Sequence, residues 1–276
     1  MRRITLRPDF GNRPFITLGF TACWHDGNQS CQRDAIIAML HSFRRRKLPW
    51  WHLGDAIEAI APYDKRFCCE SHKKTIMAQA SDAASLLRVA KDTLVGLHVG
   101  NHEDKLSRIM GDMTMDMLER AYILEDEAKR RWIGGVAITK VVCPGGSCDV
   151  VTAHSDISLG GGTSDPDHDA ERKRTKLRRY LSAFAGQLKV IAHAHQAVIA
   201  PPVTSTAVGF NGAGKFAVRP EWCAACPSMF ETYNAGDSMA YPEYAERAMY
   251  GAAGIGWIEA DIFRDGAVKG VRYVAA

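Results

Sequence analysis

The first part of the chain alternates short apolar segments with longer amphipathic ones. The β-branched, apolar segments at 14–22, 50–53 and 94–99 have the length and composition of buried strands. Helical periodicity follows two of them, because apolar side chains recur on one face from residue 30 onward and the segment 71–90 reads in the same way. This alternation predicts strands joined by helices, and therefore an α/β fold.

The rest of the chain continues this pattern and then changes character. Helices are expected over the acid-rich stretch 112–131 and the charged stretch 167–185. Residues 197–276 are Gly-rich and β-branched, and they indicate strands of a second sheet. No repeat or low-complexity linker divides the sequence, so we expect a single domain over residues 1–276. Further strands are predicted at 136–142, 149–153 and 188–192.

Composition excludes several classes of protein. Hydrophobic residues make up 46% and charged residues 24% of the chain, which is typical of a globular protein. No apolar run approaches the ~18 residues of a membrane span, and the arginines near the start precede no apolar signal segment. Eight cysteines in 276 residues indicate thiols or metal ligands rather than a disulfide scaffold. We therefore expect a cytoplasmic protein with no membrane partner.

Metal-binding residue types follow the ends of most of the predicted strands. They are His25, Asp55, Asn101, His102, His154, His193 and His195. Successive loops converge at the carboxyl edge of an α/β sheet, so these side chains are expected to meet there. Taken singly, His154 could be a structural histidine and Asp55 a helix cap. The rings of His193 and His195 point to one side of an extended segment, which favours a joint role.

Five motifs follow one another along the chain: Cys23-Trp24-His25, Gly54-Asp55-Ala56-Ile57-Glu58, Gly100-Asn101-His102-Glu103, the single His154, and His193-Ala194-His195. Their order and spacing resemble the calcineurin-like metallophosphoesterases. The resemblance covers residues 17–196, and its most specific parts are the Gly-Asn-His-Glu motif and the downstream His-x-His. A looser resemblance to prokaryotic and phage members includes residues 227–230. It extends to Tyr233, Tyr241 and Tyr244.

The resemblance implies a four-layer αββα sandwich of two mixed β-sheets flanked by helices, with a dinuclear metal centre. One divalent ion would bind Cys23, His25, Asp55 and His195. The second would bind Asp55 as a bridge, Asn101, His154 and His193. Carboxylate, imidazole and amide ligands suit two such ions, here Zn, Mn or Fe. A water shared by the ions would be acidified and would act as the nucleophile.

The resemblance also implies roles for side chains beside the ions. His102 would stabilise the phosphoryl oxygen and protonate the leaving group, a role that suits imidazole. Together with the bridging Asp55 it is the predicted catalytic pair. Glu103 would orient a neighbouring imidazole, or would simply be an acid favoured by the first turn of a helix. Glu58 is expected behind a ligand rather than on the metal.

The sequence departs from the family pattern at two positions. Cys23 stands where the family has Asp, and a thiolate favours zinc or iron over magnesium and manganese. The alternative is that Cys23 is a small buried residue and that the ion is held weakly. Asp26 is then a candidate for the missing carboxylate. Ala192 replaces a glycine in the last motif, which leaves both imidazoles in place.

Three other features have a plain structural interpretation as well as a functional one. Cys223 and Cys226 have the spacing of half a zinc site, which Cys143 and Cys148 would complete, or they are ordinary thiols. The segment 171–179 carries six basic residues and one acid, as on a solvated helix face or beside a polyanion path. The glycines at 160–162 indicate a loop close to the metals.

The leading functional hypothesis is a metal-dependent phosphoric ester hydrolase, more specifically a phosphodiesterase. The net charge of +4, from 35 basic and 31 acidic residues, tolerates a nucleotide or nucleic-acid substrate without indicating one. A nuclease is one alternative, although about 80 residues after His195 leave little room for a DNA-capping domain. The other is a non-catalytic scaffold that lost turnover with the change to Cys23. The oligomeric state is left open.

Overall fold

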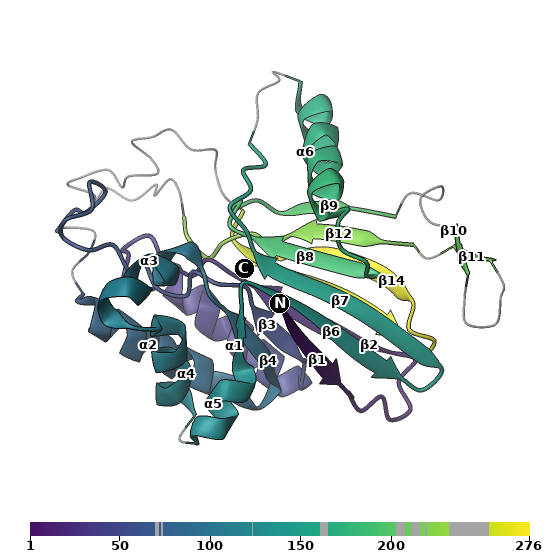
Figure 1. Cartoon of the computed structure of the whole chain (residues 1–276), viewed down its shortest axis with the longest axis horizontal. Coiled ribbons are helices and arrows are strands. Elements are labelled where there is room, and N and C mark those ends of the chain that lie inside the picture. The colour runs from purple at the N-terminus through teal and green to yellow at the C-terminus, as the bar shows by residue number, and fades with distance from the viewer. Residues whose placement is uncertain are drawn as a thin grey trace.

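The two predicted sheets pack face to face, with helices outside them (Figure 1). This computed structural model describes residues 1–69, 72, 74–122, 124–160, 165–202, 208–210, 216–218, 220–231 and 254–276. Each sheet has six strands and is mixed. The predicted αββα sandwich is thus confirmed.

The first sheet has the strand order β14-β13-β2-β3-β4-β5. Its strands are β2 (Phe15–Thr21), β3 (Trp50–His52), β4 (Leu94–His98), β5 (Trp132–Gly134), β13 (Gly256–Phe263) and β14 (Val268–Ala275). The strands β2 to β5 run parallel, whereas β13 pairs antiparallel with both β2 and β14. Every residue of β3 and β4 is buried, as expected for central parallel strands covered on both faces.

The second sheet has the order β1-β6-β7-β8-β12-β9. Its strands are β1 (Arg2–Leu6), β6 (Val136–Cys143), β7 (Gly146–His154), β8 (Leu188–Ala192), β9 (Val198–Ala200) and β12 (Trp222–Ala225). A separate pair joins β10 (Val208–Phe210) to β11 (Phe216–Val218). The C-terminal part was expected to form strands of a second sheet. It divides instead, because β9 and β12 extend this sheet while β13 returns to β2, and periodicity predicts strands but not their partners.

Helices cover the outer face of each sheet. They are α1 (Arg33–Arg46), α2 (Ile76–Val89), η1 (Lys91–Thr93), α3 (Asn101–Met110), α4 (Met113–Ala121), α5 (Glu125–Arg131) and α6 (Pro166–Leu181). The helix expected over 112–131 is two helices, because Tyr122 adopts an extended backbone between α4 and α5. The helix expected from residue 71 begins only at Ile76, capped by the Thr75 side chain.

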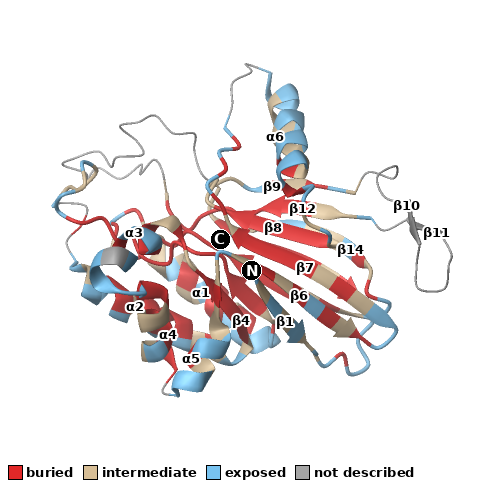
Figure 2. Cartoon of the chain, in the orientation of Figure 1, coloured by how far each residue is buried: buried red, intermediate tan, exposed pale blue. Residues whose placement is uncertain are grey.

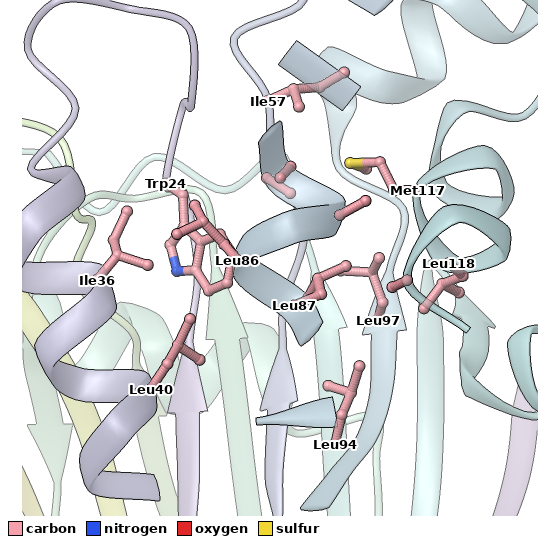
Figure 3. Packing of buried hydrophobic residues seen from close by; sticks show 14 of the residues in the cluster. Trp24, Ile36, Leu40, Ile57, Leu86, Leu87, Leu94, Leu97, Met117 and Leu118 are labelled. Carbon is pink, nitrogen blue, oxygen red and sulfur yellow. The ribbon is translucent and has the colours of Figure 1, made fainter. Parts of the chain in front are cut away.

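Three hydrophobic cores hold the layers together. The first lies between the first sheet and α1, α2 and α4, where Trp24, Leu87 and Met117 pack (Figure 3). The second fills the space between the sheets, and the third lies beneath α6. Buried positions follow these cores, whereas most of α6 is exposed (Figure 2). In the described part of the chain, no helix is both long and apolar enough to cross a membrane.

Candidate metal centre

The carboxyl ends of five strands, three from the first sheet and two from the second, meet at one edge of the sandwich. In the first sheet β2, β3 and β4 are parallel neighbours, and in the second β7 and β8 are. Parallel strands end on the same side of a sheet, so the loops that follow them converge. These loops and strand ends carry Cys23, His25, Asp55, Asn101, His102, His154, His193 and His195.

The backbone at this edge is unusual. Five of these residues have positive φ angles: 49° at Cys23, 50° at His25, 55° at Asp55, 92° at His193 and 53° at His195. Side chains other than glycine rarely adopt this left-handed region, and such residues gather at functional sites. The packing of both sheets must therefore hold these conformations in place.

One cluster combines four ligand atoms. Cys23, His25, Asp55 and His195 each offer an atom, and these atoms all lie within 4.8 Å of one another. The Nε2 atoms of His25 and His195 are 3.2 Å apart. We call Cys23, His25 and His195 the thiol half of the centre. It is the set predicted for the first ion, together with Asp55.

A second cluster shares Asp55 with the first. The ligand atoms of Asp55, His154 and His193 also lie within 4.8 Å of one another. The side-chain oxygen of Asn101 is 3.0 Å from Nε2 of His154 and 2.8 Å from Nδ1 of His193. We call Asn101, His154 and His193 the amide half of the centre. The sequence thus predicted side chains that the fold does bring together.

His102 lies beside the shared carboxylate. Its backbone N–H donates to Oδ1 of Asp55 at 2.9 Å, and its ring Nδ1 contacts the backbone carbonyl of Glu58. The side chain is buried, and its ring packs edge-on against that of His25. Burial lowers the pKa of His102, while the nearby Asp55 and Glu58 oppose that shift. The fold thus holds one ring nitrogen of His102 and leaves Nε2 for another partner.

The electrostatics of the centre favour a cation. Burial alone would raise the pKa of Asp55, but His154 and His102 hold it well below its usual value. Burial and Asp55 raise the pKa of the Cys23 thiol well above its usual value. Burial, followed by the neighbouring His25, lowers the pKa of His195 to about 3. A neutral imidazole binds metals, and a bound cation favours the thiolate.

The residues present fit a pair of divalent ions. Oδ2 of Asp55 is buried and accepts no hydrogen bond, although Nε2 of His154 lies 3.2 Å away. A buried carboxylate oxygen without a partner is costly, and a metal ion would satisfy it. Sulfur and imidazole nitrogen suit zinc, copper or iron, and the carboxylate and amide oxygens broaden the range to manganese.

Glu58 stands behind the thiol half. Its buried carboxylate lies 2.7 Å from Nδ1 of His25, 3.3 Å from the amide nitrogen of Asn28 and 3.4 Å from Nε2 of His72. Burial opposes ionisation, but His25 and then His72 lower the pKa of Glu58. This placement agrees with the prediction for Glu58. His72 was not predicted, because it lies in a segment without periodicity.

The structure decides between the two roles expected of Glu103. Its carboxylate accepts from the backbone N–H groups of Asp55 at 3.1 Å, Ala56 at 2.7 Å and Ile57 at 3.2 Å. It also accepts from the N–H of Gly100 at 3.0 Å. These bonds go to main chain and not to an imidazole, so of the two expected roles the second holds: Glu103 is an acid in the first turn of α3, where it caps the helix through the N–H of Gly100. Burial and the nearby Asp55 raise its pKa to about 7.

The loops joined by Glu103 approach very closely. A Cβ atom on Gly100 would lie 2.1 Å from the backbone nitrogen of Asp55. Glycine is therefore required at this position for steric reasons. Asp26, the alternative carboxylate, bonds to Arg33 at 2.6 Å and belongs to neither half.

The remaining cysteines form no further site. The structure describes all eight, and each is a free thiol. Cys226 packs between the sheets and Cys223 packs beneath α6, so the two face opposite sides of β12. Within the described ranges, neither belongs to a group of metal-ligand side chains. Gly161 and Gly162 lie outside the described residues, as do Tyr233, Tyr241 and Tyr244.

Comparison with known proteins gives only distant likenesses. No family model and no curated protein matches the chain. A predicted phosphoesterase from Streptococcus pneumoniae is 10% identical with a TM-score of 0.35, over 95% of this chain and 98% of that one. A Vps29 double mutant from Entamoeba histolytica is 9% identical with a TM-score of 0.39, over 95% and 99%.

A metallophosphoesterase from Sphaerobacter thermophilus is 11% identical with a TM-score of 0.38, over 94% of this chain and 88% of that one. The identities and TM-scores of all three are low. We therefore infer the function from the side chains of the centre itself.

Proposed function

We propose that the chain is a metal-dependent phosphoric diester hydrolase of the calcineurin-like metallophosphoesterase kind. The observation that carries this proposal is the position of Asp55, whose carboxylate lies both with the ligand atoms of the thiol half and with those of the amide half; a third group, His25, Glu58 and His102, does not include it. A carboxylate shared in this way is what a two-metal site requires. One domain over residues 1–276 would carry the activity, and the free thiols suit a reducing, cytoplasmic compartment.

The two halves of the centre divide the binding of the ions. Cys23, His25 and His195 would hold one ion with Asp55, and Asn101, His154 and His193 would hold the other with the same carboxylate. The ions, when bound, would activate water and polarise a phosphoryl oxygen of the ester. Ligands on loops with positive φ angles, three of them fully buried (Cys23, His25 and Asp55), would keep the required geometry in advance of binding.

His102 supplies the proton chemistry of the chain itself. Its Nδ1 faces the carbonyl of Glu58, which fixes the ring, so Nε2 is the atom that would face the ester. A protonated Nε2 would hydrogen-bond to the phosphoryl oxygen and then pass its proton to the leaving oxygen. Burial lowers the pKa of His102, and the nearby Asp55 and Glu58 act against that shift, in favour of the protonated ring.

The Asp55→Asn variant tests the proposal. The purified chain is treated with chelator and reloaded with Mn²⁺ or Zn²⁺, and hydrolysis of bis(p-nitrophenyl) phosphate is followed. Since metal ions contribute several kcal/mol to such reactions, we expect Asp55→Asn to lower kcat/KM by more than about 10³-fold. Bound metal, measured by elemental analysis, should fall as well.

The exposed Asp34 on α1 provides the matched control, and Asp34→Asn should behave like the parent. Equal turnover in Asp55→Asn and Asp34→Asn would overturn the proposal. A parent chain that folds and binds two ions, yet hydrolyses no ester with any divalent ion, would instead establish the non-catalytic scaffold.

A further inference from the structure

Helix α6 is a long helix of which little is buried. Of its 16 residues only Leu177 and Leu181 are buried, and they face the core beneath the helix. Figure 2 shows most of its surface exposed. In Figure 1 it projects from the second sheet, beside the chain that rises from the end of β7.

Three cations on α6 lack acidic partners. Lys173 pairs with Asp169 at 2.6 Å, and Arg174 and Arg178 pair with Glu171 at 3.4 and 3.5 Å. In the described part of the chain, no ion pair involves the exposed Arg172, Lys176 or Arg179. We call these three residues the basic face of α6.

The spacing of the basic face concentrates its charge. The three residues are four and three positions apart, so they lie on one side of the helix, opposite the buried leucines. Like charges at such spacing repel and weaken a helix. A polyanion bound along this face would remove the repulsion, because its phosphates would stand between the cations.

A groove lies along the basic face. It has a volume of about 620 Å³, and besides the three cations its lining includes Leu159, Gly160, His168, Lys173, Thr175 and two acids, Asp169 and Glu171, both of which are paired with basic residues of α6. Gly160 is six residues beyond His154, so at most about 21 Å of chain separates the groove from the amide half. A second groove of about 320 Å³ on the other side of α6 includes Gln196, the neighbour of His195.

We propose that the basic face binds the sugar–phosphate backbone of a nucleic-acid strand and leads it to the metal centre. From Arg172 to Arg179 the face extends about 10 Å along the helix axis. That length is enough for more than one phosphate of a strand, whereas a single phosphate ester offers only one. The delivery of a substrate rests on the proposed function, whereas the binding of a strand does not.

The triple variant R172Q/K176Q/R179Q tests the binding. Fluorescence anisotropy of a labelled 20-nucleotide oligothymidylate is measured with chelator present, so that no ester is cleaved, over a range of salt concentrations. Each phosphate contact on a single strand contributes about 0.7 to the slope of log K against log salt. We expect the triple variant to reduce that slope by about 2 and to weaken binding at low salt.

The matched control is R44Q/R45Q/K47Q, which removes three exposed cations near the C-terminal end of α1. It should leave the slope unchanged. Equal losses in both triple variants would mean attraction by net charge alone and would overturn the inference. Failure of the parent chain to bind the oligonucleotide would also overturn the inference. So would a competition experiment in which polyglutamate displaces the labelled oligonucleotide as well as unlabelled oligonucleotide does. Circular dichroism checks that both variants retain their helices.

Activity measurements separate this inference from the proposed function. In R172Q/K176Q/R179Q we expect a higher KM for oligonucleotide cleavage with hydrolysis of bis(p-nitrophenyl) phosphate unchanged. A parent chain that binds DNA through α6 but hydrolyses no ester would retain the inference and remove the proposed function. One that hydrolyses the aryl diester, with binding unaffected by the α6 substitutions, would do the reverse.

Discussion

The thiol half and the amide half of the centre share Asp55 but differ in what stands behind their imidazoles. In the thiol half, Nδ1 of His25 lies 2.7 Å from the buried carboxylate of Glu58. In the amide half, Nδ1 of His154 lies 2.7 Å from the backbone carbonyl of Leu53. A carboxylate makes an imidazole a stronger ligand than a neutral carbonyl does.

The ligand atoms themselves sharpen this difference. The thiol half adds the sulfur of Cys23, whereas the amide half adds the oxygen of Asn101. Soft sulfur selects zinc or iron, while hard oxygen accommodates manganese. We therefore expect the thiol half to hold its ion more tightly and more selectively. Two sites that share a carboxylate need not share an affinity.

The largest expected effect after that of Asp55 comes from a residue that belongs to neither half. His102→Ala should lower kcat for diester hydrolysis by about 10²- to 10⁴-fold, because a general acid is lost. Elemental analysis should still find two ions per chain. His41→Ala, on the exposed face of α1, is the control. Loss of metal in His102→Ala would show that His102 belongs to the metal-binding site. The division of the site into a thiol half and an amide half would then be incomplete.

A smaller effect should follow from weakening the support of the thiol half alone. Glu58→Gln removes the charge behind His25, and such changes typically reduce metal affinity by about 10- to 100-fold. Competition with a coloured chelator should show one ion weakened and the other retained. Glu119→Gln, at an exposed position of α4, should leave both ions unchanged. An equal loss of affinity for the two ions would contradict the proposed difference between the thiol half and the amide half.

The smallest effect concerns metal preference. Cys23→Asp replaces the soft ligand of the thiol half with a hard one, so the zinc-to-manganese affinity ratio should fall by about tenfold. Equilibrium dialysis with both metals measures this ratio directly. The free thiol Cys148, buried between the sheets, gives the control Cys148→Ser. An unchanged ratio in Cys23→Asp would show that the thiol is packing only.

Residues that end a strand were the predictable part of this site. Asp55 and His154 follow apolar runs whose length and composition indicate strands, and parallel strands bring their carboxyl ends together. The positions of Asp55 and His154 follow from local periodicity, which predicts the strands, and from the convergence of parallel strands at their carboxyl ends. Both can be inferred from the sequence. The joint role of His193 and His195 was predicted from an extended segment, and that premise is wrong, because both residues have positive φ angles just after β8 and reach different halves of the centre.

Other features of the site and the fold could not be predicted, because they depend on contacts between segments that are distant in the sequence. His72 reaches Glu58 from a loop with no pattern, and Glu103 binds main chain 46 to 48 residues away. The return of β13 to β2 joins segments more than 230 residues apart. In helix α6 the run of charged residues was visible in the sequence. Which of its cations form ion pairs was not, because that depends on side-chain geometry.

The hydrogen bonds of Glu103 have a consequence for how such a centre can change. One carboxylate fastens the turn that carries Asp55 to the turn that carries Asn101. An insertion or deletion in either turn would move the Glu103 carboxylate out of hydrogen-bonding distance of the three consecutive amides. The few residues around this carboxylate must therefore keep their length.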